Sequence, residues 1–415
     1  MKVLLWGIDS PWTINFIKNF LLKNNYEVWI LNKGEKKTSK RLNELYKKYG
    51  IHGIEFPAII TEADDKKEEN FIKFLYIHFL RIKTIIMSGP FDLINMQYVE
   101  YSDLIDAVIV KFLLRTKLIL SYWGSDLLRA DDSKLNSIGK FSKYADFVTF
   151  DNADLELKYK ELYKWAGEIP QKMVMLGLPA LDIIKYKSDN NYKNKLRKKW
   201  GIDEGKTVIA IGYNGIPEQQ HKKVLGALEK LDDAYKKKIM LLLQMSYGGS
   251  RSYRNSVIIA AKKSGFQYID IQHFLTDNEV AEIRLLTDVF INAQVTDAFS
   301  GSVCENLFAG AVLINAGWLR YNELEKYDFR YLEFTNFNTM NEIVQKALEE
   351  KIDVEKNKDL IWKLRSWETC APKWKKIYRR TCDCGKNSGN FGRRKRYKAS
   401  SLYHCNTKAS GSYSR

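Results

Sequence analysis

The sequence is poor in cysteine and has no long apolar run that is free of charge. Its five cysteines, an odd number in 415 residues, do not form the disulfide framework of a small secreted domain. The apolar stretch over residues 107–120 is interrupted by Lys111, Arg115 and Lys117, whereas a membrane-spanning helix needs roughly 20 apolar residues. The apolar run over residues 3–8 is too short for a signal-peptide core. We therefore expect a cytoplasmic protein without a membrane span.

Several ligand-binding motifs are also missing. No Asp-x-Asp pair occurs, so there is no obvious carboxylate pair to hold Mg²⁺ on a diphosphate. The segment GIDSPWT after the first predicted strand lacks the G-x-G-x-x-G of a Rossmann dehydrogenase. The spacing of Cys382, Cys384, His404 and Cys405 matches no common structural zinc site. The sequence predicts neither a metal site nor a bound cofactor.

The net charge of +17 at pH 7 suggests a nucleic-acid partner, but its location argues against one. Ten of the 67 Lys and Arg residues and one of the 50 acids lie in residues 379–415, so this tail carries +9 and the rest of the chain +8. The tail is rich in Gly, Ser and Lys and lacks apolar periodicity. A basic nucleic-acid-binding protein stays an alternative, but no compact motif of a known nucleic-acid reader is present. We expect no specific nucleic-acid partner.

Short apolar strands alternate with helical patterns, which is typical of α/β folds. Strands are predicted within residues 1–9, 26–32, 91–97, 117–123, 146–152 and 172–178, and again within residues 206–215, 238–249, 266–274, 288–294 and 311–317. These elements divide the chain into an α/β domain (1–180), a linker (181–205), a second α/β domain (206–354), a closing helical segment (355–378) and a basic flexible tail (379–415). Two such domains, joined once, form a cleft.

Polar residues follow many of these strands, at the sheet edge where open α/β sheets bind ligands. Ser300 to Ser302 begin a predicted helix whose free amides and positive end suit a diphosphate. Glu305 can accept hydrogen bonds from a sugar hydroxyl, although an acid near a helix N-terminus is favourable by itself. We expect neutralisation from groups such as His221, Lys222 or Arg251, although His221 alone is more often structural. The candidate ligand-binding residues are Tyr213, Asn214, His221, Ser246, Tyr247, Gln272, Asp297, Ser300, Gly301, Ser302 and Glu305.

Several of these segments resemble one enzyme family. YWGSDLLR in the first domain, and GYNGIPEQQH, MSYGG and SGSVCENLFAG in the second, are similar to motifs of the GT-B nucleotide-sugar glycosyltransferases. The resemblance is closest to the TDP-N-acetylfucosamine:lipid II N-acetylfucosaminyltransferase type. It implies two Rossmann-like domains that face a cleft, the first on the acceptor side and the second binding the nucleotide sugar.

The resemblance also implies a reaction. A sugar is transferred from a nucleotide-diphosphate donor to a glycan acceptor, lipid-linked, in cell-surface polysaccharide synthesis. The spacing Asp297-x7-Glu305 is similar to the Glu-x7-Glu pattern of retaining members, with Asp in place of the first Glu, and this departure leaves retaining and inverting stereochemistry open. A nucleotide-sugar epimerase of the same fold is the alternative enzyme, because it converts the donor without an acceptor.

A catalytic base is expected in the first domain, opposite the donor. Asp9, Asp126 and Asp151 each follow a predicted strand. We favour Asp126, followed by Asp9, because the aromatic pair in YWGSD could shelter the carboxylate and raise its pKa toward the working range. The alternative is that Ser125 or Asp126 caps a helix that begins there.

Residues 70–85, NFIKFLYIHFLRIKTI, are apolar nearly all round, with Lys73, Arg81 and Lys83 interspersed. This pattern favours a buried helix. The alternative is an interfacial helix that brings a lipid-linked acceptor to the cleft, with its basic residues against anionic headgroups. The protein would then contact the inner face of the cell membrane peripherally.

Overall fold

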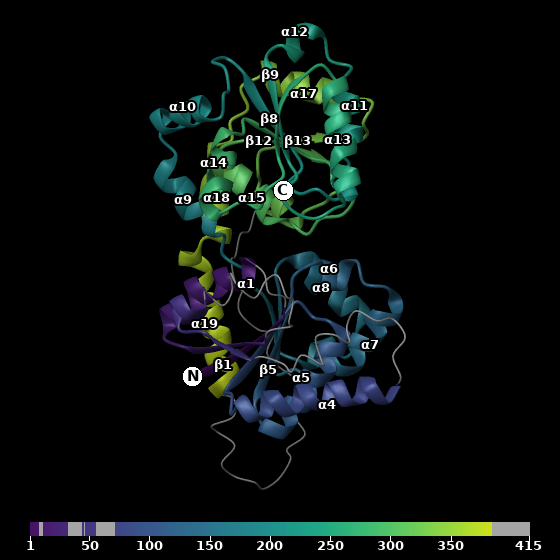
Figure 1. The fold of residues 1–415 in the computed structure, drawn as a ribbon, viewed down its shortest axis with the longest axis vertical. Helices are drawn as coiled ribbons and strands as arrows, with labels where there is room; N and C mark the ends of the chain where they lie inside the picture. Colours follow the sequence, from purple (N-terminus) through teal and green to yellow (C-terminus); the bar gives the residue numbers. More distant parts are fainter. Residues whose placement is uncertain (8–10, 32–43, 45, 55–70, 384–415) are drawn as a thin grey trace, which may run out of the picture.

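The computed structural model describes residues 1–7, 11–31, 44, 46–54 and 71–383. They form two α/β domains, each built on one parallel sheet (Figure 1). This is the predicted fold class, and every predicted strand is present. Two further strands, β3 (His52–Ile54) and β13 (Leu332–Phe334), were not predicted. Each has three residues and lies at a sheet edge, so neither contains an apolar run long enough to be recognised in the sequence.

The first sheet has the strand order β3–β2–β1–β4–β5–β6–β7. Its other strands are β1 (Lys2–Gly7), β2 (Glu27–Leu31), β4 (Leu93–Gln97), β5 (Lys117–Tyr122), β6 (Phe147–Phe150) and β7 (Gln171–Met173). The central strands are buried on both faces, which is why they read as continuous apolar runs. The direction of strand addition reverses between β1 and β4, and ligands bind outside the carboxyl ends at such a reversal.

The second sheet repeats this plan in the order β10–β9–β8–β11–β12–β13. Its other strands are β8 (Thr207–Ile211), β9 (Ile239–Gln244), β10 (Gln267–Ile271), β11 (Val289–Asn292) and β12 (Val312–Ala316). Here the reversal lies between β8 and β11. Both domains therefore offer a ligand-binding edge.

Helices cover both faces of each sheet (Figure 1). Those of the first domain are α1 (Pro11–Phe16), η1 (Ile17–Leu21), η2 (Leu22–Asn24), α4 (Phe71–Ser88), α5 (Tyr101–Leu114), α6 (Ser125–Leu128), α7 (Asp132–Ser142), α8 (Ala153–Leu162) and η3 (Ala166–Glu168). Those of the second domain are η4 (Pro217–Gln219), α11 (His221–Leu228), α12 (Asp233–Lys236), α13 (Arg251–Lys263), α14 (Asp277–Leu286), α15 (Gly301–Ala309), α16 (Asn322–Lys326) and α17 (Met340–Glu349).

The segment predicted as a linker is largely helical. It forms α9 (Pro179–Lys187) and α10 (Asn190–Lys199), and both pack on α14. The charges that suggested a linker are paired with the second domain. Lys193 and Arg197 lie 2.9 and 2.6 Å from the carboxylate of Asp288.

The predicted closing segment consists of two helices, α18 (Glu355–Arg365) and α19 (Trp367–Asp383). α19 returns to the first domain, where the ring of Trp374 lies 4.9 Å from that of Phe16 and the ring of Tyr378 lies 5.0 Å from that of Phe20. Residues 379–383, predicted to begin the flexible tail, continue α19. The remainder of that tail lies outside the described residues.

The helix predicted over residues 70–85 is α4, but the favoured burial of this helix is wrong. Leu75, Tyr76, Phe79 and Met87 are exposed to solvent, because α4 covers the edge of the domain with one side unpacked. Among the helices of the described chain, none is long and apolar enough to cross a membrane.

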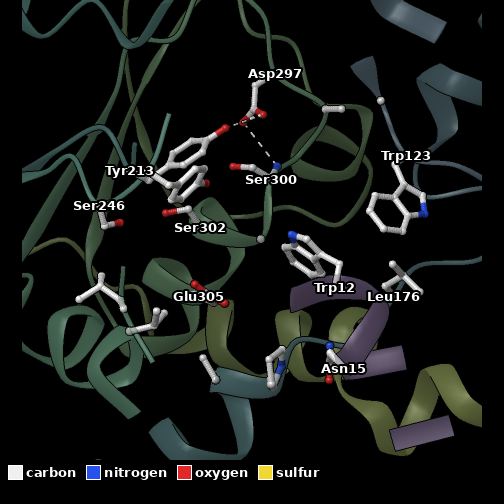
Figure 2. Close-up of a pocket in the computed structure, with 18 of the residues that line it drawn as sticks. Trp12, Asn15, Trp123, Leu176, Tyr213, Ser246, Asp297, Ser300, Ser302 and Glu305 are labelled. Atoms are coloured by element: carbon white, nitrogen blue, oxygen red, sulfur yellow. Dashed lines mark hydrogen bonds between the residues drawn. The ribbon is translucent and has the colours of Figure 1, made fainter. Parts of the chain in front are cut away.

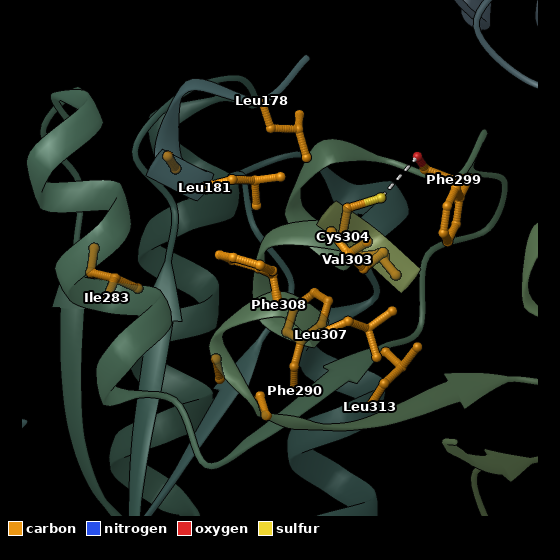
Figure 3. Close-up of a cluster of buried hydrophobic side chains, with 14 of the residues drawn as sticks. Leu178, Leu181, Ile283, Phe290, Phe299, Val303, Cys304, Leu307, Phe308 and Leu313 are labelled. Atoms are coloured by element: carbon orange, nitrogen blue, oxygen red, sulfur yellow. Dashed lines mark hydrogen bonds between the residues drawn. The ribbon is translucent and has the colours of Figure 1, made fainter. Parts of the chain in front are cut away.

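α15 packs inside the second domain among buried apolar side chains (Figure 3). Val303, Cys304 and Leu307 are buried in the hydrophobic core, and Phe308 stacks on Trp362 of α18 with ring centroids 5.8 Å apart. Burial of each large apolar side chain contributes about 1.5–3 kcal/mol. The packing fixes the position of the helix N-terminus, which faces the first domain.

Candidate functional site

A cavity of about 790 Å³ lies between the two domains, at the carboxyl ends of both sheets. Residues after β5, β6 and β7 line it from the first domain, and residues after β8, β9 and β11 from the second. Hydrogen bonds across its rim join the domains. The Arg129 guanidinium donates to Oγ1 and the carbonyl oxygen of Thr296 at 3.0 and 2.7 Å, and Asn152 Nδ2 donates to the carbonyl oxygen of Ala298 at 2.9 Å.

Eight of the eleven candidate residues line this cavity, which brings together loops that are far apart in the sequence. They are Tyr213, Ser246, Tyr247, Asp297, Ser300, Gly301, Ser302 and Glu305.

The start of α15 forms one wall of the cavity (Figure 2). The predicted helix start is confirmed, with Ser300 as N-cap and Gly301 as the first helical residue. The first backbone hydrogen bond of the helix runs from Cys304 N to Ser300 O at 3.2 Å, so the amides of residues 301–303 have no acceptor within the helix. The buried hydroxyls of Ser300 and Ser302 make no hydrogen bond within the described chain. Free amides and unpaired hydroxyls at the positive end of a helix suit an anion.

Asp297 precedes this helix and is held by two tyrosines. Its Oδ1 accepts a hydrogen bond from Tyr213 Oη at 3.3 Å, and its Oδ2 accepts one from Tyr321 Oη at 2.7 Å. The Ser300 amide also donates to Oδ2 at 3.4 Å. These bonds fix the loop between β11 and α15, and with it the direction of the helix N-terminus.

Glu305 lies deeper on the same wall and forms an ion pair. Its Oε2 is 3.1 Å from Arg284 Nε, and Arg284 Nη1 donates to Gln244 Oε1 at 2.7 Å. Burial raises the pKa of the Glu305 carboxyl, while the charge of Arg284 opposes this shift. Glu305 has a structural role, because it neutralises a buried arginine. It also lines the cavity, so it remains a candidate to bind a sugar hydroxyl.

Arginines supply the positive charge at the cavity. Arg129, Arg284 and Arg365 line it, and the sequence singled out none of them. Arg365 is buried at the end of α18, its Nη1 donates to Asp151 Oδ2 at 2.8 Å, and its Nε makes no hydrogen bond among the described residues. An arginine that lines a cavity and has an N–H group without an acceptor is well suited to bind an anionic ligand.

The cations expected from the sequence lie elsewhere. His221, Lys222 and Arg251 are not among the residues that line the cavity. His221 is fully buried, and its Nδ1 lies 3.3 Å from Tyr253 Oη. Burial lowers the pKa of His221 to about 4, so the ring is neutral at pH 7 and cannot offset a diphosphate.

Asn214 and Gln272 also fall outside the cavity lining. Asn214 Oδ1 accepts a hydrogen bond from the Ile216 amide at 3.1 Å and so stabilises its own turn. Gln272 Nε2 donates to Asp270 Oδ2 at 2.9 Å on the surface. Both residues follow strands, as predicted, but their side chains are used locally.

The glycines of the two nearby loops have a structural explanation. A Cβ atom added at Gly249, where φ is +65°, would lie 1.7 Å from the carbonyl oxygen of Gly215, and the Gly215 amide donates to Tyr247 O at 2.7 Å. The GYNG and MSYGG loops therefore pack directly on each other. Glycine is needed for this contact.

Asp126 does not fit the predicted role of base. It is buried and does not line the cavity. Its carboxylate accepts hydrogen bonds from the amides of Gly124 at 2.8 Å, of Trp123 at 3.1 and 3.2 Å, and of Val99 at 3.1 Å. Burial raises its pKa to about 6, and these amides oppose the shift. Nor does it cap α6, whose N-cap is Gly124.

Of the other two candidates, Asp151 lines the cavity but is engaged, because it pairs with Arg365 and its Oδ1 accepts from the Leu176 amide at 2.9 Å. Asp9 lies outside the described residues.

The first-domain wall is aromatic. Trp123 belongs to the aromatic pair of YWGSD that the sequence predicts near the site, whereas the sequence does not predict the placement of Trp12. Trp12 and Trp123 face the α15 wall (Figure 2). Trp123 Nε1 donates to Gln97 Oε1 at 2.8 Å, and Gln97 Nε2 donates to Asn95 Oδ1 at 3.0 Å. Asn95 Nδ2 in turn donates to Tyr378 Oη at 2.8 Å. This buried chain of hydrogen bonds fixes the indole ring and connects it to α19.

Comparison with known proteins agrees with this architecture. Residues 2–152 match the family model described as glycosyl transferase 4-like. No curated protein sequence matches the chain.

Solved structures share the fold over nearly their whole length. A glycosyltransferase from Rickettsia africae ESF-5 has a TM-score of 0.71 at 13% identity, covering 93% of this chain and 99% of that one. Anabaena HepE in complex with UDP has a TM-score of 0.68 at 14% identity, covering 91% and 99%. Sucrose-phosphate synthase from Thermosynechococcus elongatus has a TM-score of 0.69 at 11% identity, covering 93% and 100%.

These structures establish the GT-B fold, in which two Rossmann-like domains face a cleft. The family match of the first domain, taken with this fold, supports a glycosyltransferase.

Proposed function

We propose that this protein transfers a sugar from a nucleotide-diphosphate donor to a glycan acceptor. The observation that carries the proposal is the α15 N-terminus, where free amides and the unpaired hydroxyl of Ser302 face an interdomain cavity that also receives buried arginines. Donors of these kinds suit a diphosphate. The neighbour HepE was solved with UDP and with UDP-glucose, which supports a nucleotide sugar as the ligand.

The same contacts favour bond cleavage. An acceptor hydroxyl oxygen bonds to the anomeric carbon of the sugar while the bond from that carbon to the diphosphate oxygen breaks. The leaving diphosphate gains negative charge, and fixed amides and guanidinium groups stabilise it more in the transition state than in the bound donor. The proton of the acceptor hydroxyl passes to a base, and Asp9 is the residue to test in that role. In this proposal Glu305 accepts hydrogen bonds from sugar hydroxyls.

We further propose that the reaction needs no metal ion. The described residues contain no group of three or more His, Cys, Asp or Glu side chains able to hold one. Because Arg284 and Arg365 are already paired with Glu305 and Asp151, in this proposal the α15 amides and Arg129 offset most of the charge of the diphosphate. Turnover should be unchanged by EDTA. Loss of activity in EDTA and its recovery with Mg²⁺ would contradict this part of the proposal.

We place the acceptor on the first domain. Trp12 and Trp123 offer flat apolar faces on which a sugar ring can stack. In this proposal the acceptor is a lipid-linked glycan in cell-surface polysaccharide synthesis, and the protein works on the cytoplasmic face of the membrane. A TDP-sugar is the first donor to test, given the family resemblance.

The function is tested by incubating the protein with TDP-, UDP-, GDP- and CMP-sugars, each with and without acceptor. The acceptor panel contains lipid-linked saccharides and soluble sugar phosphates, because a sucrose-phosphate synthase shares the fold. We expect release of nucleoside diphosphate that depends on acceptor, and a glycosylated product by mass spectrometry. Conversion of the donor to an isomer without any acceptor would instead identify an epimerase.

A further inference from the structure

The first domain carries an exposed apolar surface on α4 and α5, two helices that pack against each other. We call it the α4–α5 face. Phe79 and Phe112 are each 59% exposed, and Met87 is 76% exposed. Among the residues of α4 and α5 whose side chains the structure describes, the exposed large apolar ones are Leu75, Tyr76, Phe79, Met87, Tyr101, Ile109, Phe112 and Leu113. Figure 1 shows α4 crossing the end of the first domain that lies opposite the second domain.

His78 and Arg81 of α4 point inward, toward α5, whereas Lys83 of the same helix is exposed. His78 Nδ1 lies 2.7 Å from Asp106 Oδ1, and Arg81 Nη2 lies 2.6 Å from Asp103 Oδ1. Both aspartates are buried. A surface helix in water normally turns its apolar side to the core and its charges to the solvent. α4 buries its ion pairs and exposes aromatic and aliphatic side chains. Its exposed side is therefore suited to contact with an apolar partner.

The border of the α4–α5 face is basic. Lys83, Arg115 and Lys143 are exposed and form no ion pair with another described residue, whereas Lys111 of α5 is paired with Asp146 at 2.7 Å. Lys143 lies over the ring of Tyr144, which packs on Phe112 with ring centroids 5.7 Å apart. α4 contains no acid, and the two acids of α5 are the buried aspartates. A second copy of the chain would bring like charges together, which disfavours a self-paired interface.

We propose that the α4–α5 face docks the protein on an anionic lipid bilayer. The exposed rings enter the boundary between headgroups and acyl chains, while the lysine and arginine side chains reach the lipid phosphates. This proposal adds a membrane-docking surface to the proposed function. It rests on that function only because a docked enzyme would meet a lipid-linked acceptor at the same membrane.

Vesicle flotation of the full chain tests the docking. Vesicles consist of phosphatidylcholine alone or with about one third phosphatidylglycerol. Binding is also measured at about 0.5 M NaCl, where the Debye length is about 4 Å and a purely electrostatic contact of the basic tail is screened. The test variant is Phe79→Ser with Phe112→Ser. The matched control is Ile259→Ser on α13, because Ile259 is 61% exposed and lies in the second domain.

We expect the wild type to bind anionic vesicles, the control to match it, and the double variant to lose on the order of ten-fold or more of its partition coefficient at high salt. Hydrogen exchange of the vesicle-bound wild type should slow in residues 71–88 and 101–115, a result that does not depend on how the variant folds.

Three outcomes would overturn the proposal. These are no vesicle binding by the wild type, binding that survives the double substitution with protection confined to residues 384–415, and a wild-type dimer that the double variant dissociates. Because no donor is present, a negative result leaves the sugar-transfer proposal intact, and failure of donor binding leaves the vesicle result intact.

Discussion

Trp12 of the first domain lies directly over Gly301 of the second. A Cβ atom added at Gly301 would lie 2.5 Å from Cη2 of Trp12 and 3.0 Å from Cδ2 of Leu178. The sequence predicts that Gly301 contacts a ligand, and a glycine lets a ligand approach the backbone closely. The structure adds a second reason, because α1 and the start of α15 can meet only if residue 301 has no side chain.

Gly301→Ala should therefore open the cavity without unfolding either domain, since the obstructing atoms belong to the end of a side chain. Turnover should fall by about ten-fold or more, because displacement of reacting groups by about 1 Å can cost 10²-fold. Adding Trp12→Phe shortens the ring and should restore part of the rate. A double variant no faster than the single variant would show that the Trp12 contact is not the cause.

Asp126→Asn is expected to lower stability and not catalysis. An amide side chain places an NH₂ group where the carboxylate accepts backbone hydrogen bonds from Val99, Trp123 and Gly124, which should cost about 1–3 kcal/mol of unfolding free energy. Urea unfolding measures this loss. Turnover per folded molecule should stay near that of the wild type, and a drop of about 10²-fold or more would return Asp126 to the role of base.

The environment of Asp126 illustrates what the sequence could and could not predict. The strands of both sheets were evident because buried parallel strands are continuous apolar runs, and the start of α15 was evident from its Ser-Gly-Ser turn. The position of a residue after a strand, however, does not determine where its side chain points. His221 and Gln272 follow strands like Tyr213 and Ser246, yet only the latter two line the cavity.

Arg365 could not have been found by local pattern. It meets Asp151 across 214 positions of sequence, and the contact depends on how α18 packs against α15. The residues around Arg365 in the sequence predict a helix and nothing more. The position of Trp12 over Gly301 likewise follows from how the domains face each other.

The buried His221 makes stability depend on pH. The unfolded chain takes up a proton near the ordinary pKa of 6.5, whereas burial lowers the folded-state pKa to about 4. The free energy of unfolding should therefore fall as the pH falls through this window. His221→Asn does not titrate, so the wild type should lose about 3 kcal/mol more than this variant between pH 7 and pH 4. Urea unfolding at each pH measures both proteins. If the wild type and His221→Asn lose the same free energy of unfolding between pH 7 and pH 4, His221 is not held neutral in the fold.

The central claim, that the N-terminus of α15 binds the donor diphosphate, is tested most directly by Ser302→Ala. Because the Ser302 hydroxyl is buried without a partner, its removal should leave the melting temperature unchanged or higher. The matched control is Ser250→Ala, which removes the N-cap of α13 away from the cavity and should lower stability by about 1 kcal/mol without affecting the donor.

The measurement is the calorimetric Kd of the nucleoside diphosphate that the wild type binds best. We predict that Ser302→Ala weakens binding by about ten-fold and keeps its melting temperature, while Ser250→Ala shows the reverse pattern. An unchanged Kd for Ser302→Ala, together with a lowered melting temperature, would contradict the account, because the hydroxyl would then serve the fold and not the ligand.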